Sequence, residues 1–287
     1  MKIAVIGANG QLGTDLASVL KADHEIVPLN HSDIEISDEA GTFEVLEKIR
    51  PEAILNTAAF HNVPKCEEEP KRAAEINILG SQNIAKAASK LKAEFIHYST
   101  DYVFDGEKKA PYTEKDLPNP LNFYALTKLA GEHAVRIYCD NHKILRVGGI
   151  YGKIPCRAKG GVNFVSAMLK QAETKKEINV VSDEYITPTY TVDIARQTGL
   201  LLGRPETGIF HVSNGGYCSW FEFAKEIFSF CKLAVKVNPI PASTYTSLLK
   251  RPSWSVMDNV RLRELGIYRM QTWQNALREH LQTLGYR

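Results

Sequence analysis

Residues 3–13 read Ile3-Ala4-Val5-Ile6-Gly7-Ala8-Asn9-Gly10-Gln11-Leu12-Gly13, and this order of residue types indicates the fold class. A short apolar run ends at glycines spaced G-x-x-G-x-x-G, after which apolar side chains recur at helical spacing at Leu12, Leu16, Val19 and Leu20. A glycine turn that follows a strand and opens a helix lets backbone amides approach a pyrophosphate closely. Because these glycines lie in that context, the sequence predicts a dinucleotide-binding site at this turn.

Strands and helices continue to alternate downstream of the glycine turn. Hydrophobic patterning predicts strands at residues 25–29, 53–56, 95–99 and 143–147, and helices at 39–49, 72–91 and 125–138. Such alternation is typical of right-handed βαβ units, so we expect a parallel sheet with helices on both faces. Beyond residue 150 glycines and prolines interrupt this alternation of strands and helices. Shorter strands are expected at 178–181, 210–212 and 235–240, and helices at 164–172, 193–202 and 220–230.

These elements predict an α/β protein with a Rossmann-type, doubly wound parallel sheet and a smaller C-terminal α/β lobe. We expect residues 1–150 to form the NAD(P)-binding core, with parts of 180–215 returning to it. Residues 151–287 are then expected to form mainly the substrate-binding lobe, which would close over a second ligand.

The composition excludes several classes of protein. The 287 residues are 44% hydrophobic and 24% charged, and the formal net charge of +2 provides no basic excess for nucleic acid. The apolar runs are too short to span a bilayer, and no signal peptide is recognisable. The five cysteines are scattered without a C-x-x-C pair, and the eight histidines have no metal-ligand spacing. We expect a cytoplasmic protein without a bound metal, a membrane contact or a nucleic-acid partner.

The end of the second strand bears on the choice of cofactor. A carboxylate there would bind the ribose 2′-hydroxyl of NAD, and a nearby arginine would accept the 2′-phosphate of NADP. The sequence has neither, since it reads Leu29-Asn30-His31-Ser32. Asn30, His31 and Ser32 can all donate hydrogen bonds to a phosphate. We therefore favour NADPH, with NADH as the alternative.

Tyr124 and Lys128 are four residues apart, so they lie on one face of a predicted helix. A neighbouring ammonium and the positive ring of an oxidised nicotinamide both favour the phenolate and lower the pKa of a tyrosine. Such a tyrosine can give its proton to a carbonyl oxygen while hydride reaches the carbon. The spacing arises easily by chance among 12 tyrosines, but its place downstream of a dinucleotide turn favours catalysis. Ser99 or Thr100, at the end of the fourth strand, can bind the same oxygen.

Taken together, three segments resemble the extended short-chain dehydrogenase/reductases, and more narrowly the dTDP-4-dehydrorhamnose reductase family. These are the glycine turn, the run Ser99-Thr100-Asp101-Tyr102-Val103-Phe104-Asp105-Gly106, and Tyr124 with Lys128. The segments 56–60, 66–70, 188–193 and 251–256 are also similar to family segments, so the likeness covers nearly the whole chain.

The resemblance implies a catalytic triad of Thr100, Tyr124 and Lys128 that reduces the 4-keto group of dTDP-6-deoxy-L-lyxo-4-hexulose to dTDP-L-rhamnose. Tyr124 would be the proton donor, Thr100 would orient the keto oxygen, and Lys128 would hold the nicotinamide ribose. The cofactor residues would be Gly7, Asn9, Gly10, Gln11, Leu12, Gly13, Asn30, Glu35, Ile36, Ala58, Ala59, Phe60, Ser99, Tyr124 and Lys128. The substrate residues would be Val63, Thr100, Asp101, Tyr102, Gly149 and Arg251.

Three departures from the family pattern affect the substrate. Pro64 follows Val63 where the family usually has Asp, and Gly149 stands where the family has a tryptophan that packs against the sugar. The loop 153–161 is also longer than usual and brings Lys153, Arg157 and Lys159, which could face a diphosphate.

Alternatives therefore stay open. The chain could reduce a different nucleotide-bound deoxysugar, or it could be a non-catalytic NADP-binding subunit similar to the regulatory subunit of methionine adenosyltransferase. We interpret His61 as a loop residue and Trp220 as a core residue, although either could contact the sugar. Family resemblance suggests a monomer or a homodimer.

Overall fold

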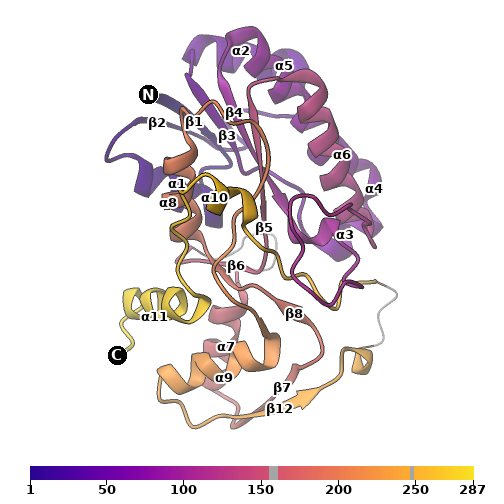
Figure 1. Cartoon of the computed structure of the whole chain (residues 1–287), viewed down its shortest axis with the longest axis vertical. Coiled ribbons are helices and arrows are strands. Elements are labelled where there is room, and N and C mark those ends of the chain that lie inside the picture. The colour runs from indigo at the N-terminus through magenta and orange to yellow at the C-terminus, as the bar shows by residue number, and fades with distance from the viewer. Residues whose placement is uncertain (155–160, 246–248) are drawn as a thin grey trace.

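Six parallel strands form the central sheet of the computed structural model, which describes residues 1–154, 161–245 and 249–287 (Figure 1). The spatial order is β10-β5-β4-β3-β1-β2. The strands are β1 (Lys2–Ile6), β2 (Glu25–Leu29), β3 (Ala53–Asn56), β4 (Glu94–Thr100), β5 (His142–Val147) and β10 (Gly208–His211). Chain order reverses at β1, which pairs with β2 on one side and with β3 on the other. The predicted doubly wound parallel sheet is therefore confirmed.

Alternate side chains of each strand face two separate layers of helices. Ile3 and Val5 pack against α1 (Gln11–Leu20), α8 (Thr191–Leu201) and α10 (Val260–Glu264). Ala4 and Ile6 face the opposite layer, formed by α2 (Glu39–Ile49), α5 (Ser81–Leu91) and α6 (Phe123–Tyr138). Because both faces are covered, β1 and β3 are apolar apart from one end residue each, as expected for buried parallel strands.

One predicted helix differs from the structure. In place of a continuous helix over 72–91, α4 (Pro70–Ala74) passes through a π-helical segment, η1 (Glu75–Gly80), into α5. The Asn77 amide of η1 bonds to the backbone of Phe60 and to Thr127 Oγ1, and Gly131 of α6 allows the Asn77 carbonyl to approach closely. These contacts come from distant parts of the chain, so a local apolar pattern cannot reveal them.

A second lobe lies below the sheet in Figure 1 and has its own apolar core. Its helices are α7 (Phe164–Ala172), α9 (Trp220–Phe230) and α11 (Trp273–Thr283). Its strands form three two-stranded sheets: β6 (Ile150–Tyr151) with β9 (Thr189–Tyr190), β7 (Glu177–Val181) with β12 (Lys236–Ile240), and β8 (Tyr185–Ile186) with β11 (Cys218–Ser219). The sequence did not predict α11, nor α3 (Val63–Glu68), which follows the third strand. The described residues also form two short 3₁₀ helices, η2 (Asp101–Val103) and η4 (Ala242–Thr244).

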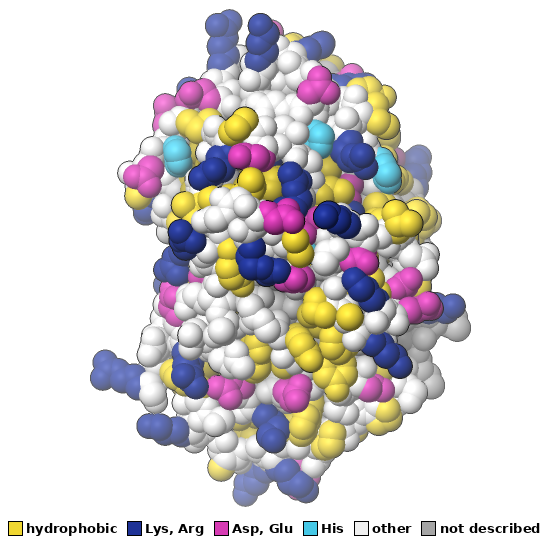
Figure 2. All heavy atoms as spheres, in the orientation of Figure 1, with side chains coloured by type: hydrophobic (Ala, Val, Ile, Leu, Met, Phe, Trp, Pro, Cys, Tyr) yellow, Lys and Arg dark blue, Asp and Glu magenta, His cyan; other side chains and the backbone are white. Residues whose placement is uncertain are grey.

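Charged side chains of both signs are interspersed over the face shown in Figure 2. Within the described ranges, no helix has the length and apolar character needed to cross a membrane.

Candidate active site

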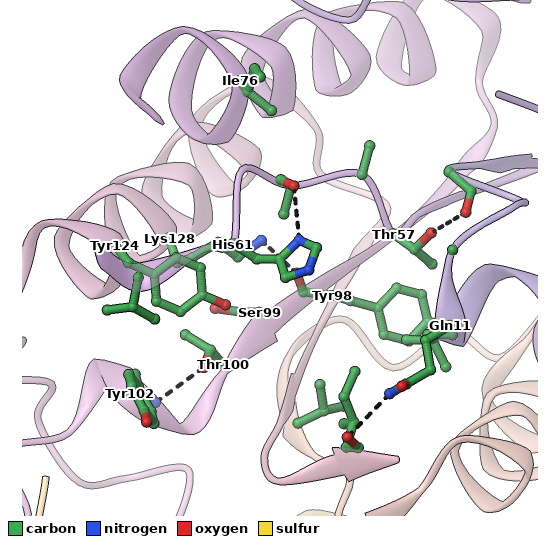
Figure 3. Close-up of a pocket in the computed structure, with 18 of the residues that line it drawn as sticks. Gln11, Thr57, His61, Ile76, Tyr98, Ser99, Thr100, Tyr102, Tyr124 and Lys128 are labelled. Atoms are coloured by element: carbon green, nitrogen blue, oxygen red, sulfur yellow. Dashed lines mark hydrogen bonds between the residues drawn. The ribbon is translucent and has the colours of Figure 1, made fainter. Parts of the chain in front are cut away.

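A cavity of about 570 Å³ lies where the carboxyl ends of the strands meet the second lobe. The sheet register brings Ile6 beside Asn56, and Thr100 beside Val147, at this edge. Doubly wound sheets bind ligands at this edge, next to the strand where chain order reverses. Helix α6 and the loops after β1, β3 and β4 supply most of the polar lining, and Figure 3 shows how these side chains converge.

The glycine turn meets the physical requirements of a pyrophosphate cradle. Gly7 has a φ of 79°, and a Cβ there would lie 2.7 Å from Thr57 Oγ1. A Cβ at Gly13 would lie 2.2 Å from the Gly7 carbonyl oxygen, so α1 can pack this closely only with glycine. No side chain caps the N-terminus of α1 at Gly10, which leaves its amides directed at the cavity. The turn therefore fits a dinucleotide, with Gly13 supporting it from behind.

Asn30, His31, Glu35 and Ile36 line the end of the cavity beside β2. Asn30 Oδ1 is buried without a hydrogen-bond partner in the described part of the chain, and the amide can present oxygen to a hydroxyl or nitrogen to a phosphate. Arg72 of α4 also reaches this end, 4.0 Å from Glu35, whereas sequence reasoning found no arginine for this region. It was missed because it follows Asn30 by about forty residues, and only the fold brings the two together.

Tyr124, Thr100 and Lys128 line the same cavity, with Tyr124 and Lys128 extending from one helix (Figure 3). Asn122 caps the start of α6 by accepting a hydrogen bond from the Ala125 amide, which fixes the first turn that carries Tyr124. Thr100 ends β4 and hydrogen-bonds to the Tyr124 side chain. Lys128 Nζ donates to the Tyr98 carbonyl at 2.7 Å and to His97 Nε2 at 3.3 Å.

Burial controls the pKa values of this group. It raises the pKa of Tyr124 well above the usual value, although the Thr100 hydroxyl opposes this. We expected Lys128 to lower the pKa of Tyr124, but burial outweighs any such lowering, so the phenol keeps its proton. Burial lowers the pKa of Lys128 to about 8, against the opposing charge of Glu132. It also holds His97 neutral, so that Nε2 can accept from the lysine.

Asp101 adds a buried carboxyl next to Thr100. Burial raises its pKa to about 6, although hydrogen bonds from Ser255 and Thr100 oppose the rise. Thr100 Oγ1 donates to Asp101 Oδ1 at 3.1 Å and accepts from the Tyr102 amide at 3.2 Å. The hydroxyl that faces Tyr124 is thus oriented by two neighbours on the same turn.

The remaining predicted residues divide into two groups. Val63, Gly149, Ala58, Ala59 and Ser99 line the cavity, as do Asn9, Gln11 and Leu12 of the turn. Ser99 donates its hydroxyl proton to Glu132 at 2.5 Å, and Glu132 in turn forms a buried ion pair with Arg146 at 2.7 Å. Phe60 and Arg251 do not line the cavity. The Phe60 backbone bonds to Asn77, and Arg251 hydrogen-bonds to the lining residue Tyr102. Arg157 and Lys159 lie outside the described residues.

Several lining residues were not among the predicted site residues. His61 lies in a loop and Trp220 packs against the core of the second lobe, as expected, and both also line the cavity. Asn163, Phe164 and Ile186 reach it from the second lobe, whose contacts no local pattern encodes.

Comparisons with known proteins point to one family. The family model described as RmlD substrate binding domain matches residues 1–285. The spore coat polysaccharide biosynthesis protein SpsK of Bacillus subtilis is 39% identical over 282 residues, which cover 98% of this chain and 97% of that protein. The crystal structure of a dTDP-4-dehydrorhamnose reductase from Clostridium acetobutylicum is similar with a TM-score of 0.95 and 37% identity, covering 99% of this chain and 100% of the other. That of the Bacillus anthracis reductase, in complex with NADP, has a TM-score of 0.93 and 34% identity, covering 98% and 99%.

Proposed function

The chain belongs to the dTDP-4-dehydrorhamnose reductase family, and from this premise we propose that it reduces the 4-keto group of dTDP-4-dehydro-6-deoxy-L-hexose to give dTDP-L-rhamnose. The electron donor is NADPH or NADH. The observation that carries the proposal is the meeting of Tyr124, Thr100 and Lys128 in the cavity into which the glycine turn also opens.

In this reaction the carbonyl carbon gains a hydride and the carbonyl oxygen gains a proton. When bound, the reduced nicotinamide supplies the hydride. Tyr124 holds the proton on its phenol oxygen and gives it to the sugar O4, which becomes the hydroxyl of the product. Thr100 holds the keto oxygen near this phenol by donating to it the hydroxyl hydrogen that Asp101 Oδ1 accepts in this structure. The raised pKa of Tyr124 suits this direction, because the phenol stays protonated until a developing alkoxide takes the proton.

Lys128 acts beside this proton transfer. Its ammonium is fixed by the Tyr98 carbonyl and His97, and it carries a positive charge into a buried site. That charge stabilises the phenolate that remains after the proton has left. The family resemblance gives the same side chain a second task, which is to hold the nicotinamide ribose.

We further propose that the protein is cytoplasmic. Cys66, Cys139, Cys218 and Cys231, the cysteines within the described ranges, are free thiols, which is typical of a reducing compartment. We also propose that the protein is a monomer or a homodimer. Light scattering coupled to size-exclusion chromatography measures this oligomeric state.

Product analysis tests the proposed substrate. The purified chain is incubated with NADPH or NADH and with a panel of 4-keto sugar nucleotides that differ in the sugar or in the nucleotide. We expect dTDP-L-rhamnose, identified by nuclear magnetic resonance, to form fastest from its own 4-keto precursor. Turnover of a different sugar nucleotide alone would replace the assigned substrate, whereas cofactor binding without any turnover, together with a co-purifying transferase, would favour a regulatory subunit.

A further inference from the structure

Trp220 is the first residue of α9 and lines the cavity that also holds the catalytic side chains. The helix begins with a capping box in which Ser219 and Glu222 satisfy each other's backbone amides. This arrangement fixes the first turn of α9 and thereby the direction in which Trp220 leaves it. The indole itself is half-buried.

Aromatic neighbours support the indole from the lobe side. The Phe164 ring lies 4.6 Å from the indole, tilted by 43°. Phe164 stacks in turn on Phe223, at 5.5 Å and 12°, and Phe223 is fully buried in the core of the lobe. These ring contacts support Trp220 in the orientation that the structure shows.

Polar contacts connect the indole to the catalytic group. The indole N–H donates a hydrogen bond to the Glu184 carboxylate, which lies beside the positive charge of Arg251. Arg251 hydrogen-bonds to the Tyr102 side chain. The Tyr102 ring meets the Tyr124 ring edge-on, with centroids 6.2 Å apart. A series of contacts thus joins Trp220 to the proton donor around one side of the cavity.

Gly149 marks a part of the cavity wall that has no side chain. Gly149 lines the cavity with a φ of 55°, and a Cβ there would lie 2.9 Å from the Thr187 carbonyl oxygen. A side chain at this position would therefore strain the backbone, so any apolar surface that faces a ligand here is provided by other residues. Among the described lining residues, Phe164, Ile186 and Trp220 contribute apolar surface from the second lobe.

We propose that Trp220 is a specificity-determining residue, whose indole is the wall against which the apolar face of the nucleotide-bound deoxyhexose packs. The inference rests on the proposed function and adds the residue that recognises the sugar. A 6-deoxyhexose presents a methyl group and ring C–H groups, and aromatic walls bind such surfaces in preference to fully hydroxylated ones. Glu184 and Arg251 act as positioning residues that hold the indole for this contact.

Kinetics of two substitutions test the proposal. We expect Trp220→Ala to raise the KM for the sugar nucleotide by about tenfold or more, because it removes an aromatic contact of roughly this strength. Its kcat should stay within a few fold of wild type, and the Kd for NADPH should not change, since the proposal places the indole against the sugar rather than against the reacting atoms or the cofactor. Trp220→Phe keeps a ring and should recover most of the affinity. It also keeps the test open should the alanine variant fold poorly.

Tryptophan fluorescence provides a second, independent readout. The chain has three tryptophans, and Trp254 is the matched control because it packs on Tyr185 and Tyr217 rather than lining the cavity. Titration with dTDP-L-rhamnose should change the emission of wild type and of Trp254→Phe, but not that of Trp220→Phe.

The outcomes separate this inference from the proposed function. If wild type turns over its substrate while Trp220→Ala keeps the wild-type KM, or if the emission change persists in Trp220→Phe, the inference is overturned and the function stands. If Trp220→Ala weakens NADPH binding instead, the indole faces the cofactor and the inference is also overturned. If wild type neither binds nor reduces the sugar nucleotide, the proposed function fails and the inference fails with it.

Discussion

At the scale of single residues, Lys128 has an unusual environment for an ammonium. It is 3% exposed, and its described hydrogen-bond acceptors are one carbonyl oxygen and one neutral imidazole. In water the ammonium would have three hydrogen-bond acceptors. Burial therefore destabilises the charged form of Lys128 and lowers its pKa to about 8. The group on which the phenolate depends therefore titrates within an accessible pH range.

This titration predicts the alkaline side of the pH profile. Lys128 carries its charge below pH 8 and loses it as the pH rises through this value. We expect kcat/KM for the reduction to fall above about pH 8, measured by loss of NADPH absorbance. Lys128→Met should be slow at all pH values and should lack this decline. A wild-type profile that stays flat to pH 9.5 would contradict the assigned role.

Asn30 leads to a prediction about cofactor choice. Asn30→Asp places a carboxylate where the adenosine ribose is expected, and a carboxylate binds a 2′-hydroxyl but repels a 2′-phosphate. We expect the NADH to NADPH ratio of kcat/KM to rise by about tenfold or more. Asn30→Ala controls for loss of the amide and should weaken both cofactors. An unchanged ratio in Asn30→Asp would place the 2′ position elsewhere.

At the scale of elements, the dinucleotide turn depends on the close approach of α1 to β1. Gly13→Ala would place a Cβ against the Gly7 carbonyl, which is backbone and cannot rotate away. We expect this variant to lose NADPH binding by at least about a hundredfold, measured by calorimetry, because the amides that face the pyrophosphate must shift. Gly199→Ala in α8 is the control, since its Cβ meets only the end of the Leu20 side chain at 3.1 Å. Equal NADPH affinity in the two variants would show that the turn tolerates the shift.

Elements that depend on local sequence could be predicted, and those that depend on distant contacts could not. The central strands and α2, α7 and α9 follow from apolar periodicity and lie where we expected them. The π-helical segment η1 exists because Asn77 reaches Phe60 and Thr127, which no window of sequence contains. The glycine turn and the Tyr124–Lys128 pair were recognisable for the same local reason. Arg72 and Trp220 were not, because separate elements bring them to the cavity.

At the scale of the whole molecule, the two lobes meet where α1, α8 and β6 converge. Thr191 Oγ1 of α8 donates to the Asp15 carboxylate of α1 and lies 3.1 Å from the Tyr151 carbonyl of β6. Burial raises the pKa of Asp15, and the hydrogen bond from Thr191 partly offsets this effect. One hydroxyl thus helps to join the nucleotide-binding sheet to the strand that enters the second lobe.

Removing this hydroxyl should weaken the junction in a pH-dependent way. Thr191→Val leaves the Asp15 carboxylate buried without its donor, so we expect the free energy of unfolding at pH 7 to fall by about 1–3 kcal/mol. The loss should be smaller at pH 4, because a protonated carboxyl costs less to bury. Urea unfolding at both pH values measures this difference. An equal loss at the two values would mean that Asp15 has the same charge at pH 4 and at pH 7, which would contradict this prediction.

The most direct test of the central claim compares wild type with Tyr124→Phe, using NADPH and dTDP-4-dehydrorhamnose. The substitution removes only the phenol oxygen, so NADPH should bind both proteins with the same Kd. Wild type should oxidise NADPH in step with formation of dTDP-L-rhamnose, and Tyr124→Phe should lose at least about a hundredfold in kcat, because the sugar O4 has lost its proton donor. Equal turnover by the two proteins would contradict the assignment of Tyr124, and a wild type that binds both ligands without oxidising NADPH would contradict the reductase itself.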